Sequence, residues 1–185
     1  MQKLRVFESI SIDGYFTDAH GDMSWAHAGA ADTEYGAWVA GNASSGRGTL
    51  LFGRKTYEQM VAFWPTPQAA QQLPEVAKGM NAAKKVVATR TLKPTWQNTT
   101  ALQGSLVEAV KALKAGAGGD ITVLGSGSVA AQLGEAGLVD EYQFVVVPIA
   151  LGAGRTVFSG AKKLKLVEQR AFRVSGNVVV TYAAA

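Results

Sequence analysis

Apolar and polar residues along this chain form short blocks whose period changes repeatedly between two residues and about 3.6 residues. Blocks typical of strands cover residues 5–12, 49–52, 86–89, 121–124 and 142–149. Blocks typical of helices cover residues 32–43, 56–63, 105–115 and 128–135. Two final strand-like runs, residues 164–174 and 178–182, are joined by Ser175, Gly176 and Asn177. The pattern therefore predicts alternating strands and helices followed by a hairpin.

Capping and turn residues mark several of these boundaries. Residues 56–59 and 105–108 each begin with Thr or Ser and carry Gln or Glu three positions later. This is the form of a capping box, so Thr56 and Ser105 are expected to be helix N-caps. Residues 18–25 are rich in turn formers and predict a long loop without regular structure.

Repeated strand–helix units fold into a parallel sheet, because each helix carries the chain back across the sheet. The expected fold class is therefore α/β, with a mostly parallel twisted sheet, helices on both faces and an antiparallel C-terminal hairpin. We find no repeat and no linker, and expect one domain over residues 1–185.

Composition narrows the class of protein. Apolar residues make up 48% and charged residues 17% of the chain, a balance typical of a globular protein. No apolar run approaches the ~20 residues that span a membrane. The N-terminal residues lack the apolar region of a signal peptide, and there is no cysteine to form a disulfide or a thiolate zinc site. We expect a cytoplasmic protein without a membrane partner.

The net charge of +4 suits an anionic ligand. The densest basic stretch contains Lys162, Lys163 and Lys165 and alternates like a strand, without the interleaved aromatic residues that stack on bases. A solvated strand edge, protected by charge against mispairing, is the better interpretation. We therefore expect no nucleic-acid partner, and a phosphorylated cofactor becomes the stronger hypothesis.

Three expected strand ends carry groups suited to phosphate. Gly53, Arg54 and Thr56 combine close backbone approach, a guanidinium and a helix start. Thr89, Arg90 and Thr91 place two hydroxyls around a second guanidinium. The third is a glycine-rich loop that matches G-x-G-x-x-A, comprising Gly125, Ser126, Gly127, Ser128, Val129 and Ala130.

Each of these signals is weak alone, since the first also describes a capped helix and the second a solvated turn. Ligands of open α/β sheets bind beyond the carboxyl ends of the strands, where all three are expected. The glycine-rich loop follows several earlier strand–helix units and lacks the acidic residue about 20 positions on that a standard Rossmann domain carries. We therefore expect a dinucleotide site on a different fold. Arg54 and Arg90 favour NADPH over NADH, because they can hold the additional phosphate.

These segments resemble a known superfamily. Residues 53–58 resemble the glycine–arginine–x–threonine segment of dihydrofolate reductases. Residues 11–15, 125–130 and 147–154 are similar to the reductase domain of the bacterial bifunctional riboflavin-biosynthesis deaminase–reductase, and the whole chain from Val6 to Tyr182 resembles stand-alone proteins built on that domain. The resemblance implies a dihydrofolate reductase-like three-layer fold, NADPH-dependent reduction of a small molecule, and a homodimer.

The resemblance also implies residue roles. Arg54 and Thr56 are expected at the adenosine phosphates, and Thr89 and Arg90 at the 2′-phosphate. Residues 125–129 are expected at the pyrophosphate. The nicotinamide and substrate side is expected to be lined by Ser11, Asp13, Tyr15, Trp25 and Leu124. Leu124 stands where the riboflavin-pathway reductases usually have a glutamate, so we expect a different substrate from their pyrimidine.

The remaining chemistry is sparse. Asp13 is the candidate catalytic carboxylate, and its alternative role is that of a turn former in Asp-Gly. His20 and His27 lack the ligand spacing of a zinc site, so no metal is expected. Two function classes stay open: an NADPH-dependent reductase of a pterin-, pyrimidine- or other heterocycle-like substrate, and a catalytically silent nucleotide-binding module.

Overall fold

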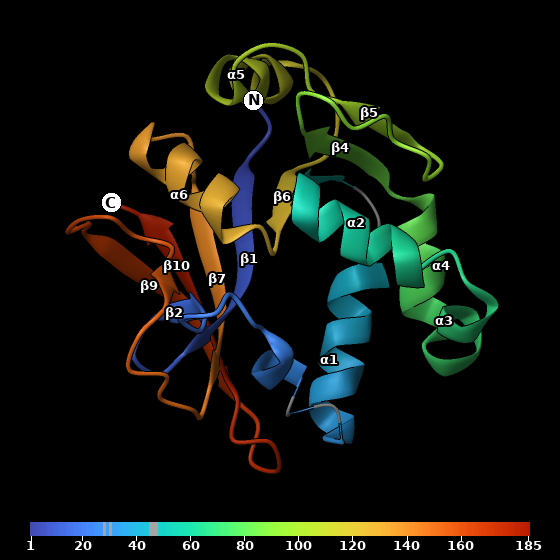
Figure 1. The fold of residues 1–185 in the computed structure, drawn as a ribbon. Coiled ribbons are helices and arrows are strands. Elements are labelled where there is room, and N and C mark those ends of the chain that lie inside the picture. Colours follow the sequence, from blue (N-terminus) through green and yellow to red (C-terminus); the bar gives the residue numbers. More distant parts are fainter. Residues whose placement is uncertain (28, 30, 45–47) are drawn as a thin grey trace.

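The computed structural model describes residues 1–27, 29, 31–44 and 48–185 (Figure 1). Its centre is an eight-stranded sheet with the strand order β5-β4-β3-β6-β1-β7-β10-β9. The strands are β1 (Leu4–Ser11), β3 (Thr49–Gly53), β4 (Lys84–Ala88), β5 (Thr99–Ala101), β6 (Ile121–Leu124), β7 (Glu141–Val147), β9 (Leu164–Ala171) and β10 (Val178–Ala184). The pairs from β5 through β7 are parallel, and β10 is antiparallel to both β7 and β9. The predicted α/β class, with a mostly parallel sheet and an antiparallel C-terminal hairpin, is confirmed.

Helices cover both faces of the sheet (Figure 1). They are α1 (Thr33–Ser44), α2 (Arg54–Phe63), α3 (Pro67–Gln72), α4 (Pro74–Ala82), α5 (Leu106–Ala115) and α6 (Gly127–Glu135). One buried cluster joins α5 and α6 to one face through Val110, Leu133 and their neighbours. Two clusters on the other face receive Tyr57 of α2, Met80 of α4 and the aromatic residues of α1. The sheet is thus the middle of three layers.

The C-terminal hairpin lies at the edge of the sheet, as predicted. Seven of the eight residues of β9 are exposed, among them Lys165 and Arg170. Charge on an edge strand discourages pairing with another chain. No helix among the described residues is long and apolar enough to cross a membrane.

Several boundaries and elements differ from the sequence-based expectation. Helix α2 begins at Arg54, with Gly53 as its N-cap, so Thr56 lies in the first turn and is not the cap. Ser105 is the N-cap of α5, and its side chain accepts from Glu108 N–H at 3.3 Å. Helices α3 and α4 were not predicted, since Pro67 and Pro74 each stand in the first turn of a helix rather than after its end.

The predicted N-terminal loop, residues 18–25, has no helix or strand over residues 18–23. Its last two residues begin a 3₁₀ helix over Ser24–His27, which the sequence analysis did not predict. Just before the loop, β2 (Tyr15–Thr17) pairs with β8 (Arg155–Thr156), a two-residue strand from a distant part of the chain. Neither of these short strands was predicted, because their pairing joins segments that local patterns cannot connect.

Candidate nucleotide site at the carboxyl edge of the sheet

The three phosphate-type junctions lie on neighbouring strands. Strand β3 pairs in parallel with β4 on one side and with β6 on the other. Their carboxyl ends therefore meet at the same edge of the sheet, where Gly53, Thr89 and Gly125 begin the three loops. The convergence expected from the sequence is confirmed by this topology.

The first turns of α2 and α6 are joined directly. The backbone N–H of Gly53 donates to Ser126 Oγ at 2.9 Å. A methyl group on Gly53 would lie 3.2 Å from Val129 Cγ2, and one on Gly125 would lie 3.3 Å from Thr56 Cγ2. Glycine at both positions lets the two helix starts approach closely, and helix N-termini favour anions.

The glycine-rich loop has an unusual backbone. Gly125 has φ +58°, and Ser126, the N-cap of α6, has φ 63° and ψ 46°. The left-handed region is costly for a residue with a Cβ, so Ser126 is held there by its surroundings. This left-handed turn leads directly into the first turn of α6, and the N-terminus of a helix favours anions.

The two arginines expected at the phosphates are exposed but differ in their surroundings. Arg54 Nη1 contacts both carboxylate oxygens of Glu58 at 2.9 Å, one turn further along α2. Arg90 has no ion pair among the described residues, and the hydroxyl of Thr89 accepts from Leu92 N–H at 3.1 Å. Arg90 is therefore free to receive an anion, whereas Arg54 must share one with Glu58.

A third arginine, missed from the sequence, lies at the glycine-rich loop. Arg155 of β8 donates to Ser128 Oγ, and its guanidinium lies 5.3 Å from the centre of the Phe16 ring. Phe16 is buried against Gly127, where an added methyl group would come within 2.5 Å of the ring. Strand β8 thus brings a cation to the N-terminus of α6.

Asp13 has a structural role that argues against its acting as an acid. Its carboxylate accepts from Ser11 Oγ at 2.5 Å, from Leu151 N–H at 3.1 Å and from Gly152 N–H at 2.7 Å. The Ser11 hydroxyl, followed by the Gly152 N–H, lowers the pKa of Asp13 to about 2. An ionised, fully bonded carboxylate holds the β1–β2 turn against the loop after β7, and it has no proton to donate near neutral pH.

Glu8 is a buried acid that the sequence analysis did not single out. It points to the α6 face of β1, where Leu4 and Val6 are core residues, and it is 2% exposed. Its Oε1 accepts from Ser9 N–H at 3.2 Å, while Oε2 has no partner among the described residues. The available signal was the alternation of β1, in which Glu8 follows Leu4 and Val6 at the inward positions.

Aromatic residues gather on the opposite face of β1. Phe7 and Tyr35 both stack on Trp38, with ring centres 6.1 and 6.2 Å away, and Trp25 packs on the same cluster. Leu124, one residue before the glycine-rich loop, packs on a neighbouring apolar cluster around Phe52. This face of β1 is therefore lined by aromatic and aliphatic side chains that pack on one another.

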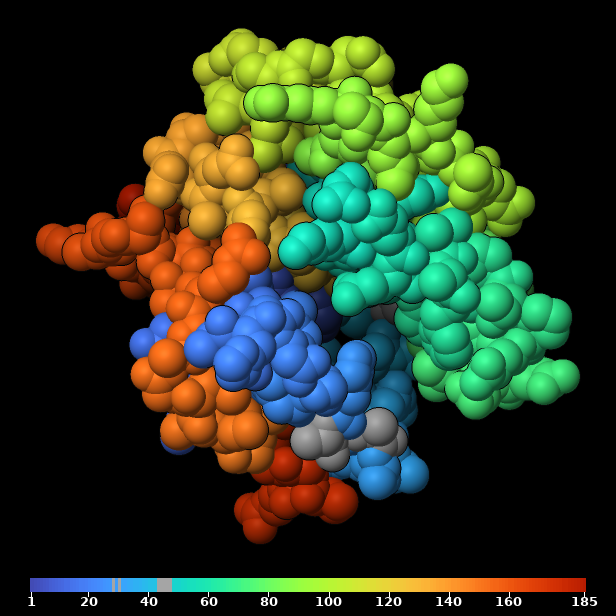
Figure 2. Space-filling view, in the orientation of Figure 1, coloured from blue at the N-terminus to red at the C-terminus, as the bar shows by residue number. Residues whose placement is uncertain are grey.

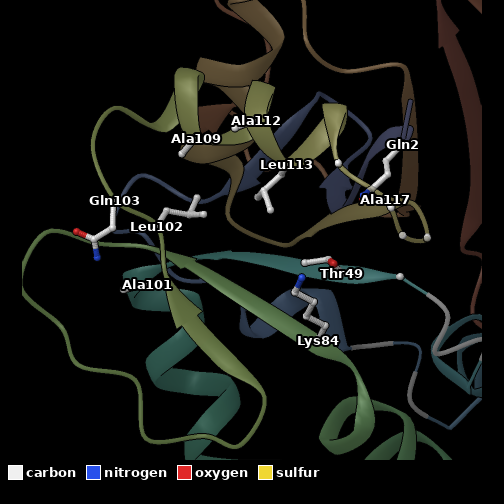
Figure 3. Close-up of a pocket in the computed structure, with 14 residues that line it drawn as sticks. Gln2, Thr49, Lys84, Ala101, Leu102, Gln103, Ala109, Ala112, Leu113 and Ala117 are labelled. Carbon is white, nitrogen blue, oxygen red and sulfur yellow. The ribbon is translucent and has the colours of Figure 1, made fainter.

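The surface is recessed between the N-terminal loop, the start of α2 and the loop before α6 (Figure 2). Two cavities lie elsewhere. One of about 600 Å³ lies at the opposite edge, between α5 and the starts of β3 and β4 (Figure 3). The other, of about 420 Å³, lies beside Trp96 and Pro65. Neither contains the phosphate-type groups, so the carboxyl edge stays the candidate site.

Residues 2–181 match the family model of the RibD C-terminal domain. The chain belongs to this family. A relative from Bacillus subtilis strain 168, the protein YyaP, is 28% identical over 177 residues, which cover 94% of this chain and 90% of YyaP. The family match agrees with the order of the motifs from the Ser11 turn to the loop after β7.

Solved structures show the same fold. A Shewanella sp. PV-4 protein assigned to riboflavin biosynthesis superposes with a TM-score of 0.71 at 20% identity, covering 100% of this chain and 99% of that one. The deaminase and 5-amino-6-(5-phosphoribosylamino)uracil reductase of Thermotoga maritima superposes with a TM-score of 0.67 at 17% identity, covering 100% of this chain and 57% of that one. At these sequence identities, the structural similarity shows a shared fold and does not extend to function.

Proposed function

We propose that this protein is an NADPH-dependent reductase of a small heterocyclic substrate. The observation that carries the proposal is the meeting of two helix N-termini at the carboxyl edge, joined by the Gly53 to Ser126 hydrogen bond and flanked by basic side chains. Membership of the RibD C-terminal domain family supports it, because the Thermotoga relative with this fold is named as a reductase.

The residues present fit a dinucleotide phosphate. The backbone at Gly125 and Ser126 is left-handed. Because Gly125 has no side chain, space beside Thr56 stays open to a ligand atom, whereas a larger residue at position 125 would press on Thr56. Residues 125–129 would hold the pyrophosphate, with Arg155 as an additional cation. Arg54 and Thr56 would contact the adenosine phosphates, and Thr89 and Arg90 would hold the 2′-phosphate. A charge-assisted hydrogen bond of this kind contributes about 1.5–3 kcal/mol.

The bound cofactor would supply a hydride, and the protein would orient the reactants and exclude water. The aromatic face formed by Phe7, Trp25 and Trp38 would hold the substrate ring. Asp13 would act as a positioning residue, because its bonds to Leu151 and Gly152 fix the turn that borders this face. A proton needed by the substrate would come from another group or from water.

Cofactor titration tests the proposal. We expect NADPH to bind more tightly than NADH, and the double variant Arg54→Ala, Arg90→Ala to lose most of that preference. Lys111→Ala on α5 removes one exposed charge away from the three loops and serves as the control. Equal affinities for the two cofactors in the unmodified protein would overturn the 2′-phosphate assignment.

The alternative function, a catalytically silent nucleotide-binding module, shares the same loops. A screen of pterin, pyrimidine and other heterocyclic compounds for oxidation of bound NADPH separates the two. Turnover of any of them identifies a reductase, whereas tight NADPH binding with no turnover across the screen favours the module.

We also propose a homodimer. Leu166 and Val167 of β9 are 51% and 58% exposed, and a second copy packed on their side chains would remove this apolar surface from water without pairing the charged strand edge. Light scattering at several protein concentrations measures the mass, and a monomer throughout would contradict the proposal.

A further inference from the structure

Glu8 lies where β6 leaves the sheet. The pairing of β1 with β6 ends at Phe7 and Leu124, and Gly125 N–H donates to Phe7 O at 2.8 Å as the chain turns toward α6. Beyond this point the Glu8 side chain occupies the space beneath the first turn of α6. The backbone N–H groups of Ser9 and Gly127 both lower the pKa of the Glu8 carboxyl group. The buried carboxyl thus faces the glycine-rich loop from inside the protein.

Among the described residues, none brings a compensating charge to the carboxyl group. The elements packed around it carry few ionisable groups: α6 has only Glu135 at its far end, and β2 and β6 have no acidic or basic side chain. On β7, Glu141 is paired with Arg5 and Lys3, and the Tyr142 hydroxyl lies beneath Gly134, near the end of α6. Arg155 of β8 reaches the outer surface of the loop at Ser128.

Burial without a countercharge favours the neutral form of a carboxyl group. Desolvation is the largest cause and raises the pKa of Glu8 to about 8, while the N–H groups of Ser9 and Gly127 oppose the shift. The unpartnered Oε2 is where the proton of the neutral form would be carried. Near neutral pH the group is therefore mostly protonated, and it ionises in the mildly alkaline range.

A helix N-terminus can satisfy one anion well, and a second one nearby is repelled. On the proposed function, a cofactor phosphate approaches the outer side of the α6 N-terminus, while Glu8 lies on its inner side. We infer that these two acidic groups exclude each other, so that the cofactor binds with a proton held on Glu8 and is released more readily when Glu8 ionises. This inference rests on the proposed cofactor site.

The consequence is a proton-linked affinity. A ligand that binds more tightly to the protein with Glu8 protonated causes Glu8 to take up protons when the complex forms. By linkage, the affinity of that ligand falls as pH rises. With ionisation near pH 8 and full exclusion, NADPH affinity is expected to fall about tenfold between pH 7 and pH 9. The 2′-phosphate of the cofactor, with a second pKa of about 6, is already ionised over this range.

The experiment is calorimetric titration of NADPH at pH 7, 8 and 9, repeated in two buffers of different ionisation enthalpy. The unmodified protein is expected to take up about half a proton per NADPH at pH 8. Glu8→Gln, which imitates the neutral carboxyl group, is expected to bind equally well at pH 7 and pH 9. Glu141→Gln removes a partly buried acid outside the loop and is expected to keep the tenfold dependence.

The outcomes separate this inference from the proposed function. NADPH binding that is independent of pH, without proton uptake in the unmodified protein, would overturn the role of Glu8 and leave the cofactor site intact. If Glu8→Gln fails to fold, the number of protons taken up by the unmodified protein on NADPH binding still tests the role of Glu8. If NADPH does not bind at any of the three pH values, both proposals are overturned, because the inference rests on the cofactor site.

Discussion

The hydroxyl of Ser126 accepts a hydrogen bond at 2.9 Å from the backbone N–H of Gly53, and so connects the N-cap of α6 to the N-cap of α2. The bond joins two loops that are 73 residues apart in the sequence. Because Ser126 also has a left-handed backbone, its side chain and its backbone make separable contributions to the site.

The variants Ser126→Ala and Ser126→Gly separate them. Both remove the hydroxyl and are expected to weaken NADPH binding severalfold, since the two helix starts are no longer fixed to each other. Only Ala keeps the cost of the left-handed backbone, so Ser126→Gly should be the more stable by roughly 1 kcal/mol. Chemical denaturation measures this difference, and equal stability of the two variants would show that the backbone is not strained.

Glu58 competes with the cofactor for Arg54. Both of its oxygens contact Arg54 Nη1 at 2.9 Å, and a carboxylate beside a phosphate site repels the ligand. Glu58→Gln is expected to tighten NADPH binding a few fold and to affect NADH less. Glu108→Gln, which breaks the similar exposed pair with Lys111 on α5, provides the matched control. Weaker binding by Glu58→Gln would mean that the pair positions Arg54.

Arg155 is expected to contribute to affinity through charge. It reaches Ser128 Oγ from β8 and lies over the Phe16 ring. Arg155→Gln should weaken NADPH and NADH alike, because the pyrophosphate is common to both, and it should reduce the salt dependence of binding. Affinities measured at two salt concentrations test this. A loss of affinity for NADPH alone would contradict this expectation and would indicate that Arg155 contacts the 2′-phosphate.

Much of this arrangement was predictable, for a physical reason. Strand–helix alternation fixes the direction of parallel strands, so Gly53, Thr89 and Gly125 had to meet at one edge once β3, β4 and β6 were neighbours. What could not be predicted depends on pairing across distance. Arg155 reaches the loop only because two-residue β8 pairs with β2.

The role of Asp13 illustrates a different limit. Asp-Gly indicated a turn, but the sequence did not show that both carboxylate oxygens are bonded by Leu151 and Gly152 after β7. The Ser11 hydroxyl is the largest cause of the lowered pKa of Asp13, and the bonds from Leu151 and Gly152 give the residue its structural role. For Glu8 the position could be predicted and the surroundings could not. Its inward direction follows from the alternation of β1, but only the packing of α6 in the structure shows that Oε2 has no partner among the described residues.

Leu124 bears on the substrate. It packs on the apolar cluster around Phe52 and offers no acceptor at the start of the glycine-rich loop. A substrate rich in hydroxyl and amide groups would leave polar groups unpaired there, at about 1–3 kcal/mol each. We expect the riboflavin-pathway pyrimidine to be a poor substrate. Turnover on the order of 1 s⁻¹ or faster in a direct assay would contradict this expectation.

Glu8 also makes the stability of the fold depend on pH in a way that needs no ligand. Burial raises the pKa of Glu8 from 4.5 to about 8, so the folded state holds a proton that the unfolded chain releases. Stability from this group is complete below pH 4.5 and declines as pH rises to about 8, where the folded state also loses the proton.

Glu8→Gln removes this dependence, because the amide does not ionise. The variant is expected to gain stability relative to the unmodified protein as pH rises from 5 to 8, and the difference should level off above pH 8. The full shift corresponds to an upper limit of roughly 5 kcal/mol, since each pKa unit is worth about 1.4 kcal/mol. Urea denaturation at pH 5, 7 and 9 measures the difference. A constant difference across that range would show that Glu8 is already ionised in the folded protein, and the proton-linked affinity would then lose its basis.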